Sequence, residues 1–323
     1  MYTMRCEECG REYPPDTSEW KCSCGGRFEI LGAPRLTTDN IDTGEHSLWR
    51  YGAAIPISEE HRISLGAGWT PMIAYRTPDE NDGRDGTGVG SRDVLLKLEH
   101  LFPSGSYKDR GAAVLMSKVR ELGITRVVED SSGNAGAAVA AFSAAAGIRA
   151  DIYVPASNSP EKLAQIRSYG AHLVPVEGSR SDTAAAALEA AKKTYYASHV
   201  QNPFFFEGTK TFAFEVWEQL GRRAPDTVVL PAGNGTLLLG SLKGFGELLE
   251  AGLIERIPAH VAVQSGACAP VAAVFEGHRT AESALGMENG STVAEGIAIS
   301  HPSLLRRMVD GVRSSGGRVI TVN

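Results

Sequence analysis

The 323-residue sequence lacks a long run of apolar residues and a strong excess of charge of either sign. Its most apolar predicted helix, at 135–148, is too short and too rich in alanine to cross a bilayer. The formal net charge of −6 is modest, which argues against a nucleic-acid-binding surface. No apolar stretch follows the first five residues, so we expect no secretory signal. We therefore expect a cytoplasmic protein that binds neither membranes nor nucleic acids.

The sequence also lacks the glycine patterns of the common nucleotide-binding folds. A dinucleotide-binding turn needs a third glycine where Leu238 stands, and the predicted strand 260–264 ends without an acidic residue. A Walker motif is missing as well. The turn after the apolar strand 227–231 is instead suited to one isolated phosphate at a helix start. The residues that would hold this phosphate are Gly233, Asn234, Gly235 and Thr236.

A lysine in the run Pro-Ser-Gly-Ser-Tyr-Lys-Asp-Arg-Gly, at 103–111, is the main candidate for catalysis. A turn precedes Lys108, and the residues after it have the apolar spacing of a helix. An amine held there can be partly desolvated, which Schiff-base chemistry requires. The run by itself would also fit a solvated lysine beside an Asp–Arg pair, because lysines are rarely buried.

A second polar turn follows the strand predicted at 126–130 and precedes an alanine-rich helix. Its residues are Ser131, Ser132, Gly133 and Asn134. Backbone N–H groups at such a helix start can bind an anion such as a carboxylate, and Asn134 can offer an amide to an aromatic hydroxyl. An ordinary turn, in which Gly and Asn tolerate unusual dihedral angles, would have the same local sequence.

Taken in order, the lysine run, the Ser-Gly-Asn turn and the glycine-rich turn resemble the fold-type II pyridoxal-phosphate enzymes of the tryptophan synthase beta superfamily. Within that group the chain is most similar to the threonine synthases, because supporting segments occur in the same order. These segments are at 48–51, 65–71, 202–211 and 293–297.

The resemblance implies a role for each candidate residue. Lys108 would carry pyridoxal phosphate and act as the general base, and the turn at 233–236 would hold the cofactor phosphate. The turn at 131–134 would bind the substrate carboxylate, with Asn134 also touching the pyridine hydroxyl. Arg110 and Lys210 are candidates for binding the phosphate that leaves the substrate. The implied reaction converts O-phospho-L-homoserine and water to L-threonine and phosphate, in a protein that is commonly a homodimer.

Three departures from the family pattern keep other functions open. Phe102 stands where the synthases usually have Asn, which removes an amide from the substrate end of the lysine loop, and Ala67 stands where they often have an acid. The Ser or Thr that faces the pyridine nitrogen belongs to a segment beyond Asn323. The alternatives are a serine/threonine dehydratase, a β-replacement enzyme related to cysteine or cysteate synthases, and a non-catalytic relative.

Four of the five cysteines lie within the first 24 residues, as two close pairs. Cys6 and Cys9 are separated by two residues, and Cys22 and Cys24 by one. Four such thiolates can bind a structural Zn²⁺ ion, and threonine synthase-like proteins often begin this way. Because no secretory signal is expected, disulfides are not, and reduced thiols without metal are the alternative. We expect Cys268 to pack as a small apolar residue.

The predicted fold class is α/β, with two three-layer α/β/α domains, a cofactor cleft between them, and a zinc-ribbon-like segment at 1–32. Alternating strands and helices after Lys108 predict parallel sheets with covered faces. We assign 33–100 and 200–323 to a large domain that holds the cofactor phosphate, and 101–199 to a small domain. Helices are expected to start at 159–160 and 181–182, and a hairpin tip is expected at 81–90.

Overall fold

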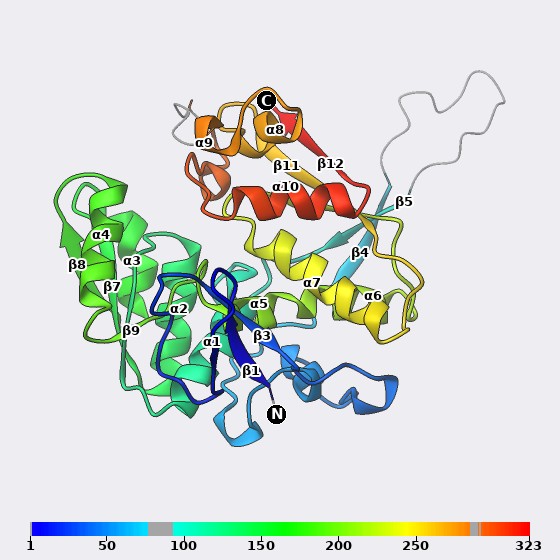
Figure 1. Ribbon diagram of the computed structural model, residues 1–323, viewed down its shortest axis with the longest axis horizontal. Helices are drawn as coiled ribbons and strands as arrows, with labels where there is room; N and C mark the ends of the chain where they lie inside the picture. Colours follow the sequence, from blue (N-terminus) through cyan, green and yellow to red (C-terminus); the bar gives the residue numbers. More distant parts are fainter. Residues whose placement is uncertain (1, 77–92, 285–289, 291) are drawn as a thin grey trace.

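The computed structural model describes residues 2–76, 93–284, 290 and 292–323 (Figure 1). The hairpin tip predicted at 81–90 lies outside these residues. The described strands form four sheets, of which two are entirely parallel. None of the helices in the described part of the chain combines the length and the hydropathy that a membrane crossing requires.

A small antiparallel sheet opens the chain, in the order β2-β1-β3. Its strands are β1 (Thr3–Cys6), β2 (Glu12–Tyr13) and β3 (Phe28–Leu31). Three short 3₁₀ helices follow, namely η1 (Thr38–Asn40), η2 (Leu48–Ala54) and η3 (Glu59–His61). The antiparallel pair β4 (Met72–Arg76) and β5 (Asp93–Lys97) then leads to the lysine run.

The first parallel sheet has the strand order β8-β7-β6-β9. Its strands are β6 (Arg126–Glu129), β7 (Arg149–Pro155), β8 (His172–Val176) and β9 (Tyr195–Tyr196). Its helices are α1 (Lys108–Glu121), α2 (Asn134–Ala146), α3 (Pro160–Ser168) and α4 (Arg180–Ala190). The alternation of strand and helix predicted after Lys108 is confirmed here, because each crossover helix returns the chain for another parallel strand.

The second parallel sheet has the order β10-β11-β12 and lies well apart from β7 and β8 in Figure 1. Its strands are β10 (Thr227–Pro231), β11 (Ala259–Ser265) and β12 (Arg318–Val322). The helices of this part are α5 (Pro203–Thr209), α6 (Thr211–Gln219), α7 (Thr236–Glu250), α8 (Pro270–Phe275), α9 (Ala281–Ala284) and α10 (Leu305–Ser314), with the 3₁₀ helix η4 (Glu295–Ile297).

Two of the helix starts show how local sequence sets the element boundaries. The Ser159 hydroxyl accepts the Lys162 N–H and Pro160 takes the first helical position, so α3 begins as predicted. The start predicted for α4 at 181–182 is wrong by two residues. Ser179 caps that helix, because its hydroxyl accepts the Asp182 N–H while the Asp182 carboxylate accepts the Ser179 N–H.

Buried apolar side chains form two large cores. The first joins the N-terminal sheet and the 48–67 region to α1, α2, β6 and β7, whereas the second joins α6, α7, α10, β10 and β11. Tyr107 packs against both of them, so the residue before Lys108 lies where the two cores meet. The boundaries assigned near residues 32, 100 and 199 stay predictions.

Candidate active site

The turn before α7 leaves backbone donors free at a helix start. Gly235 has φ +77°, which favours glycine, and a Cβ at this position would overlap the Met308 side chain. Among the described residues, no side chain caps the helix that begins at Thr236. The first N–H groups of α7 have no partner within the helix, and they therefore suit an anion.

Lys108, the first residue of α1, lies at this turn. Its Nζ is 3.3 Å from Thr236 Oγ1 and also donates to the Tyr107 hydroxyl. The Tyr107 hydroxyl is in turn 3.0 Å from Thr236 Oγ1. Thr236 is fully buried, while Tyr107 and Lys108 are half-buried. The candidate lysine and the candidate phosphate turn, which are far apart in the sequence, are thus in direct contact.

The turn at 131–134 follows β6 and leads into α2, whose N-cap is Gly133. The Gly133 N–H donates to Ser131 Oγ over 3.3 Å, and a Cβ at Gly136 would overlap the Ser131 carbonyl oxygen. The turn is therefore folded tightly over the helix start, with Gly133 and Asn134 exposed. Within the described chain no hydrogen bond joins these residues to Lys108 or to the turn at 233–236.

A buried aspartate that the sequence reasoning missed holds the lysine turn. Asp109 is fully buried, and its carboxylate accepts the Ser104 N–H over 2.8 Å and the Ser104 hydroxyl. Burial raises the pKa of Asp109, and the two bonds from Ser104 oppose that rise. Gln165 on α3 also donates to the Ser104 carbonyl over 2.8 Å. The backbone that carries Lys108 is therefore fixed from two sides.

Arg110 and Lys210, which are predicted to bind a leaving phosphate, are both fully buried and paired with carboxylates. The Arg110 guanidinium lies 2.5 Å from Glu215 Oε1 and 2.7 Å from Glu99 Oε1. The Lys210 amine contacts two glutamates and a backbone carbonyl: Glu207 at 2.5 Å, Glu247 at 2.9 Å and Ala54 O at 2.9 Å. Their donors are already used inside the protein, where an unpaired charge would be costly.

Phe102 is buried beside Arg110, a placement that the sequence did not predict. Its side chain is only 6% exposed, and the Arg110 guanidinium lies 5.0 Å from the centroid of its ring. A ring in this position shields the buried Arg110 from water. The substitution of the usual Asn by Phe102 therefore fits a packing role beside the Arg110 network.

The four N-terminal cysteines converge on one point, with every Sγ within 4.8 Å of the others. Cys6 Sγ is 3.5 Å from Cys24 Sγ, and Cys9 Sγ is 3.6 Å from Cys22 Sγ. Four thiolates around zinc, each about 2.3 Å from the ion, would be roughly 3.8 Å apart. All four are free thiols, and Cys268 is free and buried, as predicted.

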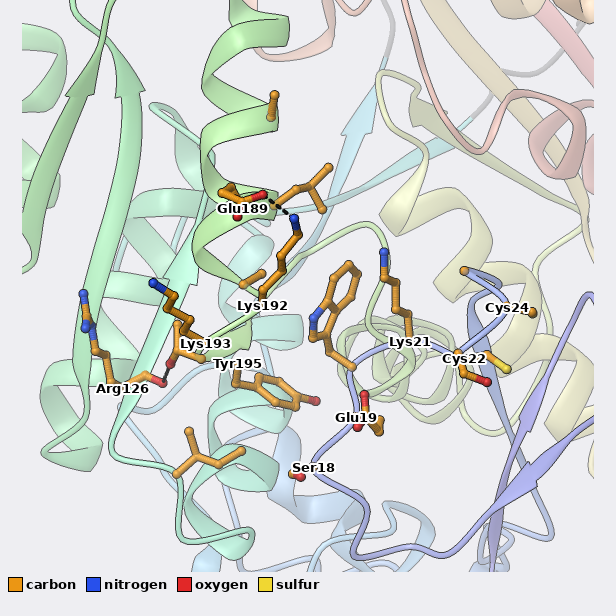
Figure 2. Close-up of a pocket in the computed structure, with 18 of the residues that line it drawn as sticks. Ser18, Glu19, Lys21, Cys22, Cys24, Arg126, Glu189, Lys192, Lys193 and Tyr195 are labelled. Atoms are coloured by element: carbon orange, nitrogen blue, oxygen red, sulfur yellow. Dashed lines mark hydrogen bonds and ion pairs between the residues drawn. The ribbon is translucent and has the colours of Figure 1, made fainter.

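Cys22 and Cys24 also line a cavity of about 1090 Å³ between the N-terminal segment and the end of α4 (Figure 2). Figure 2 shows Lys21, Lys192 and Lys193 around this opening, with Lys192 bound to Glu189. The cavity is separate from the Lys108 site, because neither Lys108 nor the turns at 131–134 and 233–236 line it.

Comparison with known proteins defines the class first. Residues 63–323 match the family model described as pyridoxal-phosphate dependent enzyme. Threonine synthase from Methanocaldococcus jannaschii is 32% identical over 97% of this chain and 77% of its own length. The enzyme from Methanosarcina acetivorans is also 32% identical, over 100% of this chain and 78% of its own length. The threonine synthase of Mycobacterium tuberculosis is 30% identical over 87% and 75% of the two chains.

Solved structures support the same fold. Maize serine racemase superposes with a TM-score of 0.60 at 21% identity, over 72% of this chain and 68% of that protein. An O-ureido-L-serine synthase superposes with a TM-score of 0.59 at 23% identity, over 78% and 73% of the two chains. At these identities the likeness establishes the fold alone, which is the α/β fold of the type II pyridoxal-phosphate enzymes with its parallel sheets.

The chain therefore belongs to the pyridoxal-phosphate-dependent enzymes and, within them, to the threonine synthase family. The resemblance inferred from its motifs is confirmed, and the chain is a lyase that uses pyridoxal phosphate. The residues present fit this cofactor, because an uncapped helix start, with a glycine at 235 where a side chain would overlap Met308, lies beside a half-buried lysine.

Two residues near this site were not found from the sequence. His199 and Glu129 are buried, they bind each other, and His199 also reaches Asn234. They come from separate segments, and neither belongs to a recognisable motif. Only their placement in the folded chain brings them to the turn at 233–236.

Proposed function

We propose that the protein converts O-phospho-L-homoserine and water to L-threonine and phosphate. The observation that carries this proposal is the contact of the Lys108 amine with Thr236 at the uncapped start of α7. It places a reactive amine beside a turn built for an anion. The substrate itself is taken from the threonine synthases that the chain resembles over most of its length.

In this proposal the backbone N–H groups of 233–236 and the Thr236 hydroxyl hold the cofactor phosphate, so the glycines are needed for close approach. When bound, pyridoxal phosphate draws electron density from the substrate carbon next to the amine. Lys108 takes the proton from that carbon and later returns protons to the substrate chain. Tyr107 and Thr236 hold the amine at the start of α7, where it would meet a cofactor bound by the turn at 233–236.

The turn at 131–134 is proposed to bind the substrate carboxylate. No side chain in the described part of the chain caps its helix start, Gly133 and Asn134 are exposed, and Ser131 Oγ accepts the Gly133 N–H. Asn134 is the proposed partner of the pyridine hydroxyl. Substrate held between this turn and the turn at 233–236 would lie in a cleft between the small domain, 101–199, and the large domain, 33–100 with 200–323.

A substrate panel tests the proposal against a dehydratase or a β-replacement enzyme. The purified protein with pyridoxal phosphate is expected to release phosphate and form threonine from O-phosphohomoserine in equal amounts. Little keto acid is expected from serine or threonine. If keto acid from serine or threonine is the main product, the protein is a dehydratase. Sulfide or sulfite consumed with O-activated serines would instead indicate a β-replacement enzyme.

We also propose that the four N-terminal cysteines hold one structural Zn²⁺ ion, which makes the first 32 residues a zinc-ribbon-like segment. Cys6 ends β1 and Cys22 lies in the turn before β3, so an ion there would join the strands of the small sheet. The resemblance further supports a homodimer located in the cytoplasm, and light scattering of the purified protein tests the oligomeric state.

Elemental analysis tests the zinc proposal. The wild-type protein is expected to contain one zinc ion per chain, and Cys6→Ser and Cys22→Ser are expected to lose it, because a closed structural site needs all four ligands. Cys268→Ser is the matched control: it removes a buried thiol outside the cluster and should keep the metal. Equal zinc content in all four proteins would refute the assignment.

A further inference from the structure

A buried ion pair or hydrogen-bonded pair lies behind the candidate phosphate turn. Glu129, the last residue of β6, is fully buried, and His199, which follows β9, is 6% exposed. His199 Nδ1 lies 2.7 Å from Glu129 Oε1, and no described group bonds to Glu129 Oε2. Burial raises the pKa of Glu129, and the imidazole opposes that rise. Burying two titratable groups costs free energy, so we infer that the pair has a role beyond filling space.

The second nitrogen of the imidazole points to the turn. His199 Nε2 lies 3.4 Å from Asn234 Nδ2, and the ring packs edge-on against Phe205. Because Asn234 Nδ2 can only donate, the ring accepts at Nε2 and directs Nδ1–H to Glu129. That acceptor selects the NH₂ end of the Asn234 amide. The amide oxygen of Asn234 is therefore turned away from His199.

The same strand end carries the other candidate turn. Asp130 comes between Glu129 and Ser131, and its carboxylate is bound by the Tyr196 hydroxyl at 2.6 Å and by Arg180 at 2.7 Å. The end of β6 is thus anchored immediately before the turn at 131–134. Glu129 and His199 connect this anchored strand end to Asn234, 105 residues further along the chain than Glu129.

We propose that His199, held by Glu129, is a positioning residue that sets the orientation of the Asn234 amide and so joins the strand end before the turn at 131–134 to the turn at 233–236. The proposal rests on the proposed function of the latter turn as the holder of the cofactor phosphate. His199 acts on the cofactor only through Asn234, so its effect disappears when the Asn234 amide is removed.

A double-mutant cycle tests the proposal by the affinity of the apoprotein for pyridoxal phosphate, measured by fluorescence titration. His199→Phe keeps an aromatic ring against Phe205 but removes both hydrogen bonds, and it should weaken binding about five- to tenfold. Asn234→Ala should weaken binding by a similar or larger factor. The double variant should bind as Asn234→Ala does, because the two residues act in series.

The chain offers a matched control for the loss of a buried histidine. His260 also packs edge-on against a phenylalanine, Phe245, and its two ring nitrogens also make hydrogen bonds, to Ser241 and to the Pro258 carbonyl. It lies near the start of β11, away from both turns. His260→Phe should lower the melting temperature of the apoprotein yet leave the affinity for pyridoxal phosphate at the wild-type value.

The outcomes separate this inference from the proposed function. If the wild type binds pyridoxal phosphate but His199→Phe binds it equally well, or if the losses multiply in the double variant, the positioning role is wrong. If the wild type itself does not bind, the proposed function fails as well. If His199→Phe does not fold, His199→Gln replaces it in the cycle, because glutamine keeps a donor and an acceptor. The double variant His199→Gln, Asn234→Ala must then bind pyridoxal phosphate as tightly as Asn234→Ala does.

Discussion

Replacement of Lys108 by alanine is expected to lower the rate of threonine formation by at least about 10³-fold while the protein keeps its fold. The amine is the proposed base at the substrate carbon, and general acid–base catalysis by a positioned side chain contributes roughly 10²- to 10⁴-fold. The side chain is half-buried, and its amine bonds to Tyr107 and Thr236 among the described residues, so its removal leaves the core intact.

Phosphate release from O-phosphohomoserine and the melting temperature are the two measurements for this variant. Borohydride should fix the cofactor irreversibly to Lys108 in the wild type and not to Lys108→Ala. Lys192→Ala is the control, because that amine forms an exposed ion pair with Glu189 at the end of α4. Wild-type turnover by Lys108→Ala would remove the central residue of the proposed mechanism.

Glu215→Ala should be the most destabilising single change in the network around Arg110, by roughly 3–5 kcal/mol. Glu215 is fully buried and accepts from Arg110, from Lys97 at 2.8 Å and from the Trp69 N–H at 2.8 Å. Its removal takes away a carboxylate partner of both buried cations, Arg110 and Lys97. Denaturant unfolding of the variant and the wild type gives the difference directly.

Glu250→Ala is the matched control for Glu215→Ala. Glu250 also faces an arginine, Arg35, but at 3.8 Å and with both side chains about two-thirds exposed. Solvent screens such a pair, so its loss should change the free energy of unfolding by about 1 kcal/mol or less. Equal effects of the two substitutions would contradict the importance of the buried network.

The pH dependence of stability gives an independent check on Glu215. Burial raises its pKa, but the charges of Arg110 and Lys97 outweigh burial and lower the pKa from 4.5 to about 2. A carboxyl whose pKa falls on folding stabilises the native state above its unfolded pKa and loses this contribution as pH falls. The stability difference between wild type and Glu215→Ala should therefore be largest above pH 4.5 and shrink toward pH 2.

Local sequence was enough to predict the bounds of strands and helices that are set by neighbouring residues. Thr227–Pro231 is a strand with the predicted bounds, and Pro160 opens α3 as its capping pattern indicates. The error at α4 is also local: Ser179 and Asp182 have the spacing of a capping box, which would have placed the start correctly.

Local sequence was not enough where the partners are distant in the sequence. Arg110 and Lys210 stand in the expected motifs, but whether their charges are free depends on Glu215, Glu99 and Glu207. The Glu129–His199 pair joins residues 70 apart. A pattern along the chain shows which residues can ionise, whereas only the packed structure shows which of them neutralise one another.

The position of Tyr107 has a consequence for how the enzyme can change over time. Its ring touches both cores, and its hydroxyl meets the Lys108 amine and Thr236. Substitutions that repack either core therefore reach the reactive amine through a single neighbouring side chain. Substitutions that stabilise one core are therefore expected to change turnover as well, because they shift this tyrosine.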